Sequence, residues 1–217
     1  KLAGFLLVMQ CPVCYEKSYS LYSQINELKY FQCQSCKAIY LDKKNYLDQQ
    51  EEKLRYELHN NELNDPSYRK FLSQLHNPLI KKLVKGSSGL DYGCGPGPAL
   101  AEMFKESCCC MDLYDPFFFP DESYKNKKYD FVTCSEAAEH FFNPLEEFQK
   151  IDKILNKGGW FGMMTNFYDD SIPFEDWYYR KDPTHVVFYS LETVSAIASM
   201  MTWSCEIPSQ NVVLFQK

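Results

Sequence analysis

A glycine-rich turn near the middle of the chain places the strongest constraint on the fold. The sequence Gly89-Leu-Asp91-Tyr-Gly93-Cys-Gly95-Pro-Gly97-Pro98 continues a short apolar strand and leads into a predicted helix. Glycines in such a turn let backbone N–H groups approach a ligand at the carboxyl edge of a parallel sheet. The spacing differs from the G-x-G-x-x-G of dinucleotide-binding turns, and an acid lies two residues before Gly93. The turn therefore predicts an α/β fold with a ligand site at that edge.

The motif D-x-G-x-G-x-G, which runs from Asp91 to Gly97, is the first motif of class I S-adenosylmethionine-dependent methyltransferases, and the chain resembles that family. Segments in the expected order extend the resemblance over about 130 residues: Cys108–Pro116, Tyr129–His140 and the glycine turn within Leu155–Thr165. The resemblance implies a Rossmann-like, seven-stranded methyltransferase sheet with helices on both faces. It also implies an enzyme that takes a methyl group from S-adenosylmethionine.

The resemblance further implies which residues hold S-adenosylmethionine. An acid at the end of the second strand would bind the ribose hydroxyls. We expect Asp115 rather than Asp112, because Asp112 falls inside the apolar run and Asp115 precedes the proline that ends it. At least one ring of Phe117–Phe119 is expected beside the adenine, with the others in the core. The predicted cofactor-binding set is Asp91, Tyr92, Gly93, Cys94, Gly95, Asp115, Pro116, Phe117, Ser135 and Glu136.

Two matching cysteine pairs lie near the start of the chain. Cys11-Pro-Val-Cys14 and Cys33-Gln-Ser-Cys36 are separated by eighteen residues. A C-x2-C turn lets two thiolates reach one metal, and two such turns complete the tetrahedral site that zinc prefers. The alternatives are a pair of redox dithiols or coincidence, but no βαβ pattern surrounds either pair. We therefore predict a small zinc ribbon with Cys11, Cys14, Cys33 and Cys36 as ligands, folded largely by the metal.

The chain of 217 residues is expected to divide into three parts. These are a zinc-ribbon module (1–47), a helical connector or cap (48–86) and an S-adenosylmethionine-binding domain (87–217). A helix start is predicted at Asp65-Pro66, with a kink or restart near Asn77-Pro78. The apolar run of residues 2–9 is far shorter than the ~20 residues that span a bilayer. We interpret it as a cloning remnant before Met9 or as a strand of the module.

Charge and cysteine content bear on partners and compartment. Lys and Arg total 23 against 29 Asp and Glu, a net charge of −6. This balance makes nucleic acid an unlikely partner, because such proteins bind the phosphate backbone with clustered basic residues. Three adjacent cysteines at 108–110 would mispair easily under oxidising conditions. A cytoplasmic location, away from membranes, is therefore predicted.

Methyl transfer mainly requires alignment of acceptor and methyl group, and a base is needed only if the acceptor must lose a proton. Two segments could supply one: Glu139-His140, and the insertion Asn166–Ser190, which contains an aromatic run and His185. Histidine titrates in the range a base needs, so His185 is the first catalytic candidate, followed by His140 with Glu139, and then His59. The alternative for each is a packing residue with no chemical role.

Two functions follow from these features. The first is methyl transfer, by in-line displacement, to an oxygen, nitrogen or carbon atom of a small-molecule acceptor, with the zinc module helping to shape the site. The second is a cofactor-binding or scaffold protein that uses the zinc module to dock a macromolecule, protein rather than RNA.

Overall fold

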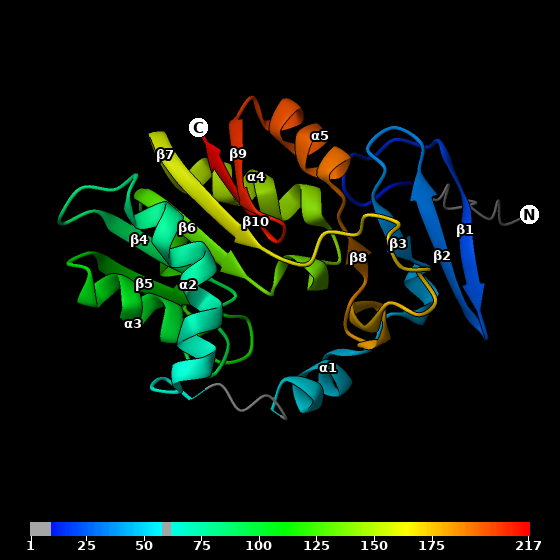
Figure 1. Ribbon diagram of the computed structural model, residues 1–217, viewed down its shortest axis with the longest axis horizontal. Helices are drawn as coiled ribbons and strands as arrows, with labels where there is room; N and C mark the ends of the chain where they lie inside the picture. Colours follow the sequence, from blue (N-terminus) through cyan, green and yellow to red (C-terminus); the bar gives the residue numbers. More distant parts are fainter. Residues whose placement is uncertain (1–9, 58–61) are drawn as a thin grey trace, which may run out of the picture.

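The computed structural model describes residues 10–57 and 62–217, which form two β-sheets side by side (Figure 1). The strands of the larger sheet are β4 (Ser88–Tyr92), β5 (Cys110–Tyr114), β6 (Tyr129–Ser135), β7 (Leu155–Met164), β9 (Ser204–Ser209) and β10 (Val212–Gln216). Their spatial order is β5-β4-β6-β7-β10-β9. The α/β fold expected from the glycine turn is confirmed.

The central strands end level with one another. Strands β4, β5, β6 and β7 run parallel, whereas β10 pairs antiparallel with both β7 and β9. Tyr92 lies opposite Tyr114, and Asp91 lies opposite Thr133. The loops that follow β4, β5 and β6 therefore meet at one edge, where open α/β sheets bind their ligands.

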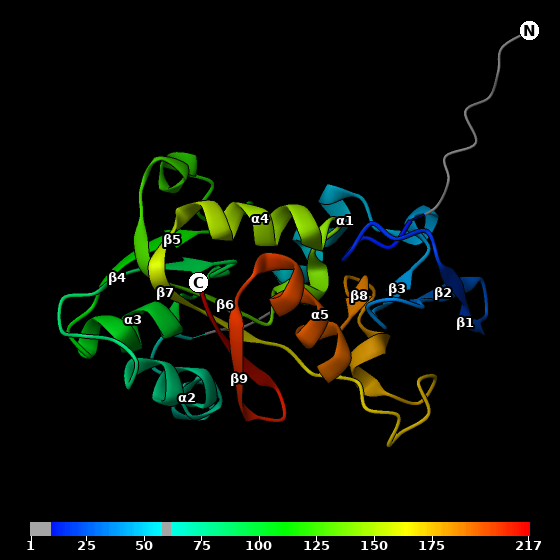
Figure 2. The same ribbon diagram turned by 90° about the horizontal axis from the view of Figure 1, so that it is seen from above.

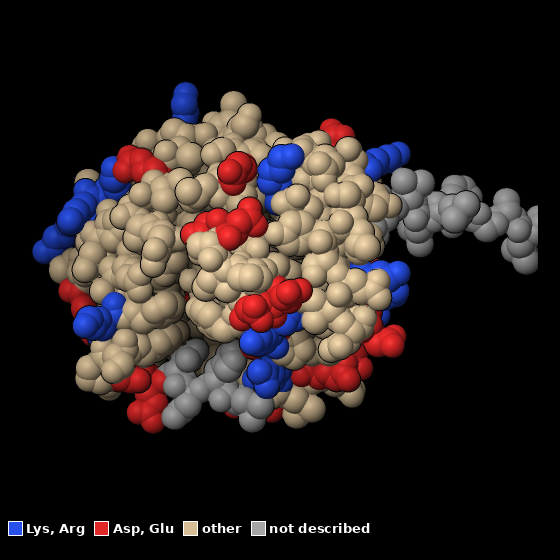
Figure 3. Space-filling view, turned by 45° about the vertical axis from the view of Figure 1, so that its right-hand side comes forward, with Lys and Arg blue, Asp and Glu red and all other residues tan. Residues whose placement is uncertain are grey.

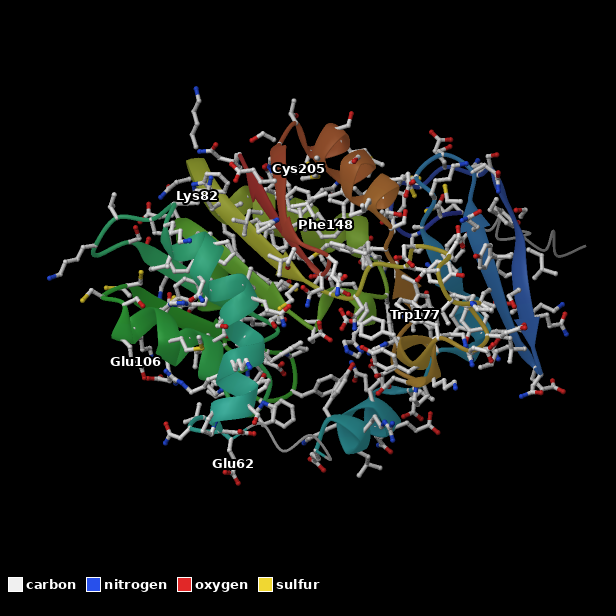
Figure 4. The ribbon with its side chains drawn as sticks, viewed as in Figure 1. Glu62, Lys82, Glu106, Phe148, Trp177 and Cys205 are labelled. Atoms are coloured by element: carbon white, nitrogen blue, oxygen red, sulfur yellow. The ribbon has the colours of Figure 1, made fainter. Side chains whose placement is uncertain are left out.

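Helices cover both faces of the larger sheet. They are α2 (Pro66–Ile80), α3 (Ala99–Glu106), α4 (Pro144–Ile154) and α5 (Leu191–Met201), with α2 and α3 on the opposite side from α4 (Figure 2). Strand β10 shows the division by alternation. Val212 and Leu214 pack in the core beneath α2 and α3, whereas Val213 and Phe215 pack in the core beneath α4 and α5. Phe148 of α4, labelled in Figure 4, is fully buried in the second core.

The expected seventh strand is absent from the described residues, so the strand count is corrected to six. Only 14 residues separate β5, which ends at Tyr114, from β6, which begins at Tyr129. They contain an isolated bridge between Asp115 and Phe119 and a single 3-10 turn, η2 (Glu122–Asn126). One parallel crossover alone takes a dozen or more residues. This segment is therefore too short to hold another strand with the helices leading to and from it.

The smaller sheet combines three N-terminal strands with one strand from the insertion after β7. Strands β1 (Tyr19–Ile25), β2 (Leu28–Cys33) and β3 (Ile39–Leu41) form an antiparallel meander, and β8 (Val187–Phe188) pairs with β3. The fourth strand thus comes from the insertion that follows β7. Trp177 of that insertion, labelled in Figure 4, packs on Phe188 at 5.8 Å between ring centroids. The small N-terminal sheet and the insertion are therefore one packed unit.

The connector contains two helices, and both start where the sequence predicts. Helix α1 (Gln49–Tyr56) is capped by Asp48, and α2 starts after Asp65, whose side chain accepts the Ser67 N–H at 2.8 Å. Of the expected kink or restart near Asn77-Pro78, the restart is wrong, because α2 continues through Pro78 to Ile80. Its buried leucines, Leu72, Leu75 and Leu79, pack on the sheet on both sides of that proline.

Some expectations fall outside the part of the chain that the structure describes. The apolar run of residues 2–9 and the candidate base His59 both lie there. Among the helices that are described, none has the length and apolar character needed to cross a membrane.

Candidate active site

A cavity of about 620 Å³ lies at the carboxyl edge of the larger sheet. Two sets of residues that line it are defined here. The glycine-turn group follows β4 and β5 and consists of Gly93, Cys94, Gly95, Asp115 and Phe117. The Glu–His group consists of Glu136, Glu139 and His140, which follow β6, and His185, which lies in the insertion. One cavity is therefore lined by most of the predicted cofactor residues and by the catalytic candidates Glu139, His140 and His185.

The glycine-turn group depends on backbone conformations that favour glycine. Gly93 and Gly95 have φ values of 79° and 63°, in the region that side chains disfavour. A Cβ at Gly93 would lie 2.6 Å from the Cβ of Ala137. The Gly93 N–H donates to the Tyr114 carbonyl at 2.8 Å, which fixes the turn against the end of β5. The turn is thus held tightly at the cavity wall.

Asp115 and Asp112 have different surroundings. Asp115 is buried and accepts hydrogen bonds from the backbone N–H groups of Gly95 at 3.0 Å, Phe117 at 2.9 Å and Phe118 at 3.1 Å. Asp112 instead accepts hydrogen bonds from Lys127 and Tyr129, both at 2.7 Å, and is not among the residues that line the cavity. Of the two acids, Asp115 is the one that the fold brings to the cavity.

Most of the other predicted cofactor residues also line the cavity: Tyr92, Pro116, Ser135 and Glu136. Asp91 does not, because it is buried behind the turn, where its carboxylate accepts a hydrogen bond from the Thr133 hydroxyl at 2.7 Å. Burial raises the pKa of Asp91 to about 6, and the nearby Asp115 charge adds to the effect. Asp91 therefore lies behind the turn, on strand β4, and not in the cavity wall.

The Glu–His group is closely packed. A donor atom from each of Glu139, His140 and His185 lies within 4.8 Å of the others, and the two imidazole centroids are 4.7 Å apart. Glu139 is completely buried and accepts hydrogen bonds from the hydroxyls of Tyr179 and, at 2.9 Å, Thr165. The two predicted histidines, 45 residues apart in sequence, therefore meet beside one buried carboxyl group.

Glu136 has a strained backbone and a shifted pKa. Its φ is 49°, a value that residues other than glycine rarely adopt. Burial, followed by repulsion from Glu139, raises the pKa of Glu136 to about 9. Its Oε2 lies 3.4 Å from the Tyr179 hydroxyl, which also serves Glu139. Two carboxyl groups thus share one donor, and burial lowers the pKa of the neighbouring His185.

Backbone hydrogen bonds connect the Glu–His group to the smaller sheet. The Val186 N–H donates to the Glu139 carbonyl at 2.9 Å, and the Leu41 N–H donates to the Val186 carbonyl at 2.9 Å. The Tyr189 hydroxyl donates to the Ala138 carbonyl, also at 2.9 Å. The loop after β6, the insertion and the N-terminal module are therefore joined at the position of the Glu–His group.

The four predicted metal ligands also converge. The sulfur atoms of Cys11 and Cys36, and those of Cys14 and Cys33, are each 3.5 Å apart, and all four lie within 4.8 Å of one another. Each pair is followed by a residue with left-handed backbone, Tyr15 or Lys37. Sulfur atoms at tetrahedral corners around zinc are about 3.8 Å apart for a Zn–S bond of about 2.3 Å. The cluster therefore fits a zinc ion.

Sequence reasoning missed several residues that complete the site. Glu52 and Tyr56 of α1 line the cavity, although that helix reads as an exposed polar segment. Thr165 and Tyr179 hold Glu139, and only Tyr179 stood out, as part of the aromatic run in the insertion. No local pattern marks Glu52 or Thr165, because both roles depend on contacts between distant segments.

Comparisons with solved structures return methyltransferases at low sequence identity. A SAM-dependent methyltransferase from Aquifex aeolicus is 15% identical, with coverage of 76% of this chain and 96% of that chain and a TM-score of 0.49. An O-methyltransferase family protein from Burkholderia thailandensis is 12% identical, with coverage of 70% and 57% and a TM-score of 0.49. The YcgJ protein from Bacillus subtilis is 17% identical, with coverage of 61% and 69% and a TM-score of 0.43. No curated protein matches the chain.

The family model of the methyltransferase domain matches residues 65–200, well over half of the chain. The chain therefore belongs to the methyltransferase domain family, and it is a class I S-adenosylmethionine-dependent methyltransferase. This confirms the resemblance drawn from the glycine turn. The match begins at the N-cap of α2, so the cysteine module and α1 lie outside it.

Proposed function

We propose that the protein transfers a methyl group, by in-line displacement, to a small-molecule acceptor that binds beside the Glu–His group. The observation that carries the proposal is the shared cavity, which the glycine-turn group and the Glu–His group both line. Its volume of about 620 Å³ is in the range of small-molecule sites. Cofactor and acceptor would therefore lie side by side, as direct transfer requires.

The glycine-turn group fits S-adenosylmethionine. When bound, this cofactor supplies an activated methyl group on a positively charged sulfur. The tight turn at Gly93 and Gly95 would let the backbone approach the cofactor, Asp115 would accept hydrogen bonds from its ribose hydroxyls, and Phe117 would lie against its adenine. The cavity lining contains five acidic side chains, Glu52, Asp115, Glu136, Glu139 and Glu147, and one lysine, Lys150. This negative balance favours a cationic ligand.

His185 is the proposed proton acceptor, with His140 and Glu139 beside it. The Nδ1 of His185 lies 2.7 Å from the Tyr179 carbonyl, which can only accept, so that nitrogen carries the proton. Nε2 then bears the lone pair. Since burial lowers the pKa of His185, the ring is neutral at physiological pH and can take a proton from an acceptor.

The four-cysteine cluster is proposed to bind zinc and to hold the acceptor side of the site in place. Cys33 ends β2, which pairs with β3, and β3 pairs with β8, which begins two residues after His185. Tyr15, next to Cys14, also donates a hydrogen bond to Glu146 at 2.9 Å, and Glu146 lies in the first turn of α4. A bound zinc would therefore stabilise the segments that carry His185 and the loop after β6.

The surface supports a small-molecule acceptor over a nucleic acid. On the face in Figure 3, Lys and Arg are interspersed with Asp and Glu, without a broad basic patch among the residues described on that face. The overall charge of −6 agrees with this. A protein with this charge and these free cysteines would function in a reducing cytoplasm. The scaffold alternative gives no role to the buried Glu–His group.

A labelling experiment tests the proposal. The protein is incubated with S-adenosylmethionine carrying a labelled methyl group and with a cell extract separated into small-molecule, protein and RNA fractions. We expect label in the small-molecule fraction, and a loss of that label in the His185→Ala variant. Label in the protein or RNA fraction alone would contradict the small-molecule acceptor. Calorimetry on the same preparation measures cofactor binding separately.

A further inference from the structure

The Glu–His group contains more metal-type donor atoms than one proton transfer requires. Donor atoms of Glu139, His140 and His185 lie within 4.8 Å of one another. Glu136 lines the same cavity, and its buried Oε1 has no hydrogen-bond partner among the described residues. We propose that these four side chains bind one divalent cation, such as Mn²⁺ or Mg²⁺. The proposal rests on the proposed function in placing the acceptor beside this cation, and it changes one role: Nε2 of His185 would bind the cation, so the cation rather than His185 would promote loss of the acceptor proton to solvent.

Both imidazoles are oriented as metal ligands usually are. Nδ1 of His140 lies 3.0 Å from the Thr184 carbonyl oxygen, and Nδ1 of His185 lies 2.7 Å from the Tyr179 carbonyl oxygen. Carbonyls only accept, so each Nδ1 donates its proton and each Nε2 bears the lone pair. Histidines that bind metals donate their second N–H to a backbone carbonyl or a carboxylate in this way. The tautomers needed for metal binding are therefore set by the backbone.

The carboxylates are held by a further layer of contacts. The hydroxyls of Thr165 and Tyr179 both donate to Glu139, which fixes a side chain that is completely buried. Glu136 keeps its left-handed backbone because its N–H donates to the Met164 carbonyl at 2.8 Å. Backbone strain of this kind persists where the surroundings impose it, and it gathers at ligand sites. Here it accompanies a side chain that lines the cavity.

The charge and the spacing of the group suit a dication. Two buried carboxylates without a cation repel each other in a medium of low dielectric, and a divalent ion between them would neutralise both. Donor atoms on opposite sides of an octahedral ion are about 4 Å apart for a metal–oxygen bond of about 2.0–2.1 Å. Glu139 Oε1 and His140 Nε2 are already 3.9 Å apart. Small side-chain rotations would therefore bring the other donors, now within 4.8 Å, to bonding distance.

The donor chemistry separates this site from the cysteine cluster and indicates the acceptor. Four thiolates select zinc, whereas carboxylate oxygens suit Mn²⁺ and Mg²⁺ and imidazoles suit transition metals, so the mixed set of the Glu–His group favours a transition-metal dication such as Mn²⁺. A cation on three or four protein groups keeps coordination positions for oxygen atoms of a ligand, and it lowers the pKa of a bound hydroxyl. The acceptor class is therefore a hydroxyl compound with a second oxygen close enough to bind the same ion.

Titration with Mn²⁺ alone tests the site. Protein carrying one zinc per chain is titrated with Mn²⁺, and unbound Mn²⁺ is followed by its electron paramagnetic resonance signal. We expect one Mn²⁺ per chain, and at least about tenfold weaker binding in His185→Ala and in Glu139→Gln. His76→Ala is the matched control, because His76 contacts Ser107 and Phe104 and is not a lining residue of the cavity. It should retain the wild-type affinity.

Calorimetry with S-adenosylmethionine on the same samples separates the possible failures. A variant that keeps its cofactor affinity within about threefold is folded at the cavity, and His140→Gln provides a further variant if His185→Ala does not fold. The cation site is overturned if wild-type protein binds no Mn²⁺ up to about 1 mM, or if the variants bind it as tightly as wild type. Loss of cofactor binding by wild-type protein would instead contradict the proposed function.

Discussion

The glycine-turn group and the Glu–His group line one cavity but are built in different ways. The first comes from the ends of β4 and β5, and its members lie within 25 consecutive residues, 93–117. The second combines a loop after β6 with His185 from the insertion, and its Val186 contact connects it to β3 of the smaller sheet. The larger sheet therefore supports one group, whereas the cysteine module supports the other.

Because different sheets support the two groups, cofactor binding and methyl transfer should depend on different parts of the molecule. The parallel strands that carry the glycine-turn group do not need the smaller sheet for their hydrogen bonds. The position of His185 does depend on that sheet, because β8 begins two residues later. Damage to the module should therefore affect the acceptor side first, and damage to the ends of β4 and β5 should affect the cofactor first.

The largest expected effect comes from removing a zinc ligand. Cys36→Ser should lower label transfer to the acceptor by about 100-fold, because a three-ligand site binds zinc weakly and the smaller sheet loses its support. Cofactor affinity should change by less than about threefold. Metal analysis, label transfer and calorimetry measure the three quantities. Cys205→Ser is the control, since this exposed cysteine lies on β9 (Figure 4). Equal losses of cofactor binding and transfer in Cys36→Ser would break the comparison.

The next largest effect is on the cofactor side. Asp115→Asn should weaken S-adenosylmethionine binding about 10- to 30-fold, or roughly 1.4–2 kcal/mol, at the lower end of what hydrogen bonds to a charged group contribute. Asp112→Asn should bind the cofactor normally, because Asp112 pairs with Lys127 and Tyr129 away from the cavity. Calorimetry on both variants measures the difference. A larger loss of cofactor affinity in Asp112→Asn than in Asp115→Asn would show that Asp112 is the acid that binds the ribose.

A smaller effect on methyl transfer is expected from removing the Tyr179 hydroxyl, which Glu136 and Glu139 share as a hydrogen-bond donor. Tyr179→Phe should lower label transfer about tenfold and the free energy of unfolding by about 1–2 kcal/mol, because Glu139 loses a buried hydrogen bond. Cofactor affinity should stay unchanged. Tyr178→Phe is the neighbouring control, because Tyr178 is 68% exposed and its hydroxyl accepts a hydrogen bond from Asn166 at 2.7 Å, away from Glu139. Equal effects of the two changes on transfer would remove Tyr179 from the site.

The same contrast explains how much the sequence could predict. Glycine and acid spacing within one turn located Gly93 and Asp115, because the turn and the strand ends that hold them are encoded locally. The C-x2-C spacing brought the four cysteines together for the same reason. Glu52 and Thr165 could not be predicted, because their roles arise only when α1 and the end of β7 approach the cavity. The prediction of a seventh strand was wrong because it came from the family pattern, and the 14 residues between β5 and β6 are too few to hold another strand.

The smallest effect concerns stability and sets Asp91 against Asp112. Because burial raises the folded pKa of Asp91 to about 6 from 3.8, its ionisation opposes folding, and this cost appears as pH rises from about 4 to 6. Asp91→Asn should therefore gain stability relative to wild type, by an amount that grows by about 1.4 kcal/mol between pH 5 and pH 8. At Asp112, the effect of burial is outweighed by the hydrogen bonds from Lys127 and Tyr129, which lower its pKa. Asp112→Asn should then lose stability at neutral pH.

Urea unfolding at pH 5 and pH 8 measures these differences directly. A gain in Asp91→Asn that does not depend on pH would mean that packing, and not the buried charge, sets the stability of the turn. If the gain follows pH and cofactor affinity falls in the same variant, the carboxylate of Asp91 is a group that costs stability and serves binding. The segment that carries the glycine-turn group would then keep a buried ionisable side chain, Asp91, as the Glu–His group does with Glu136 and Glu139. The two regions would differ in the sheet that supports them rather than in the burial of acidic side chains.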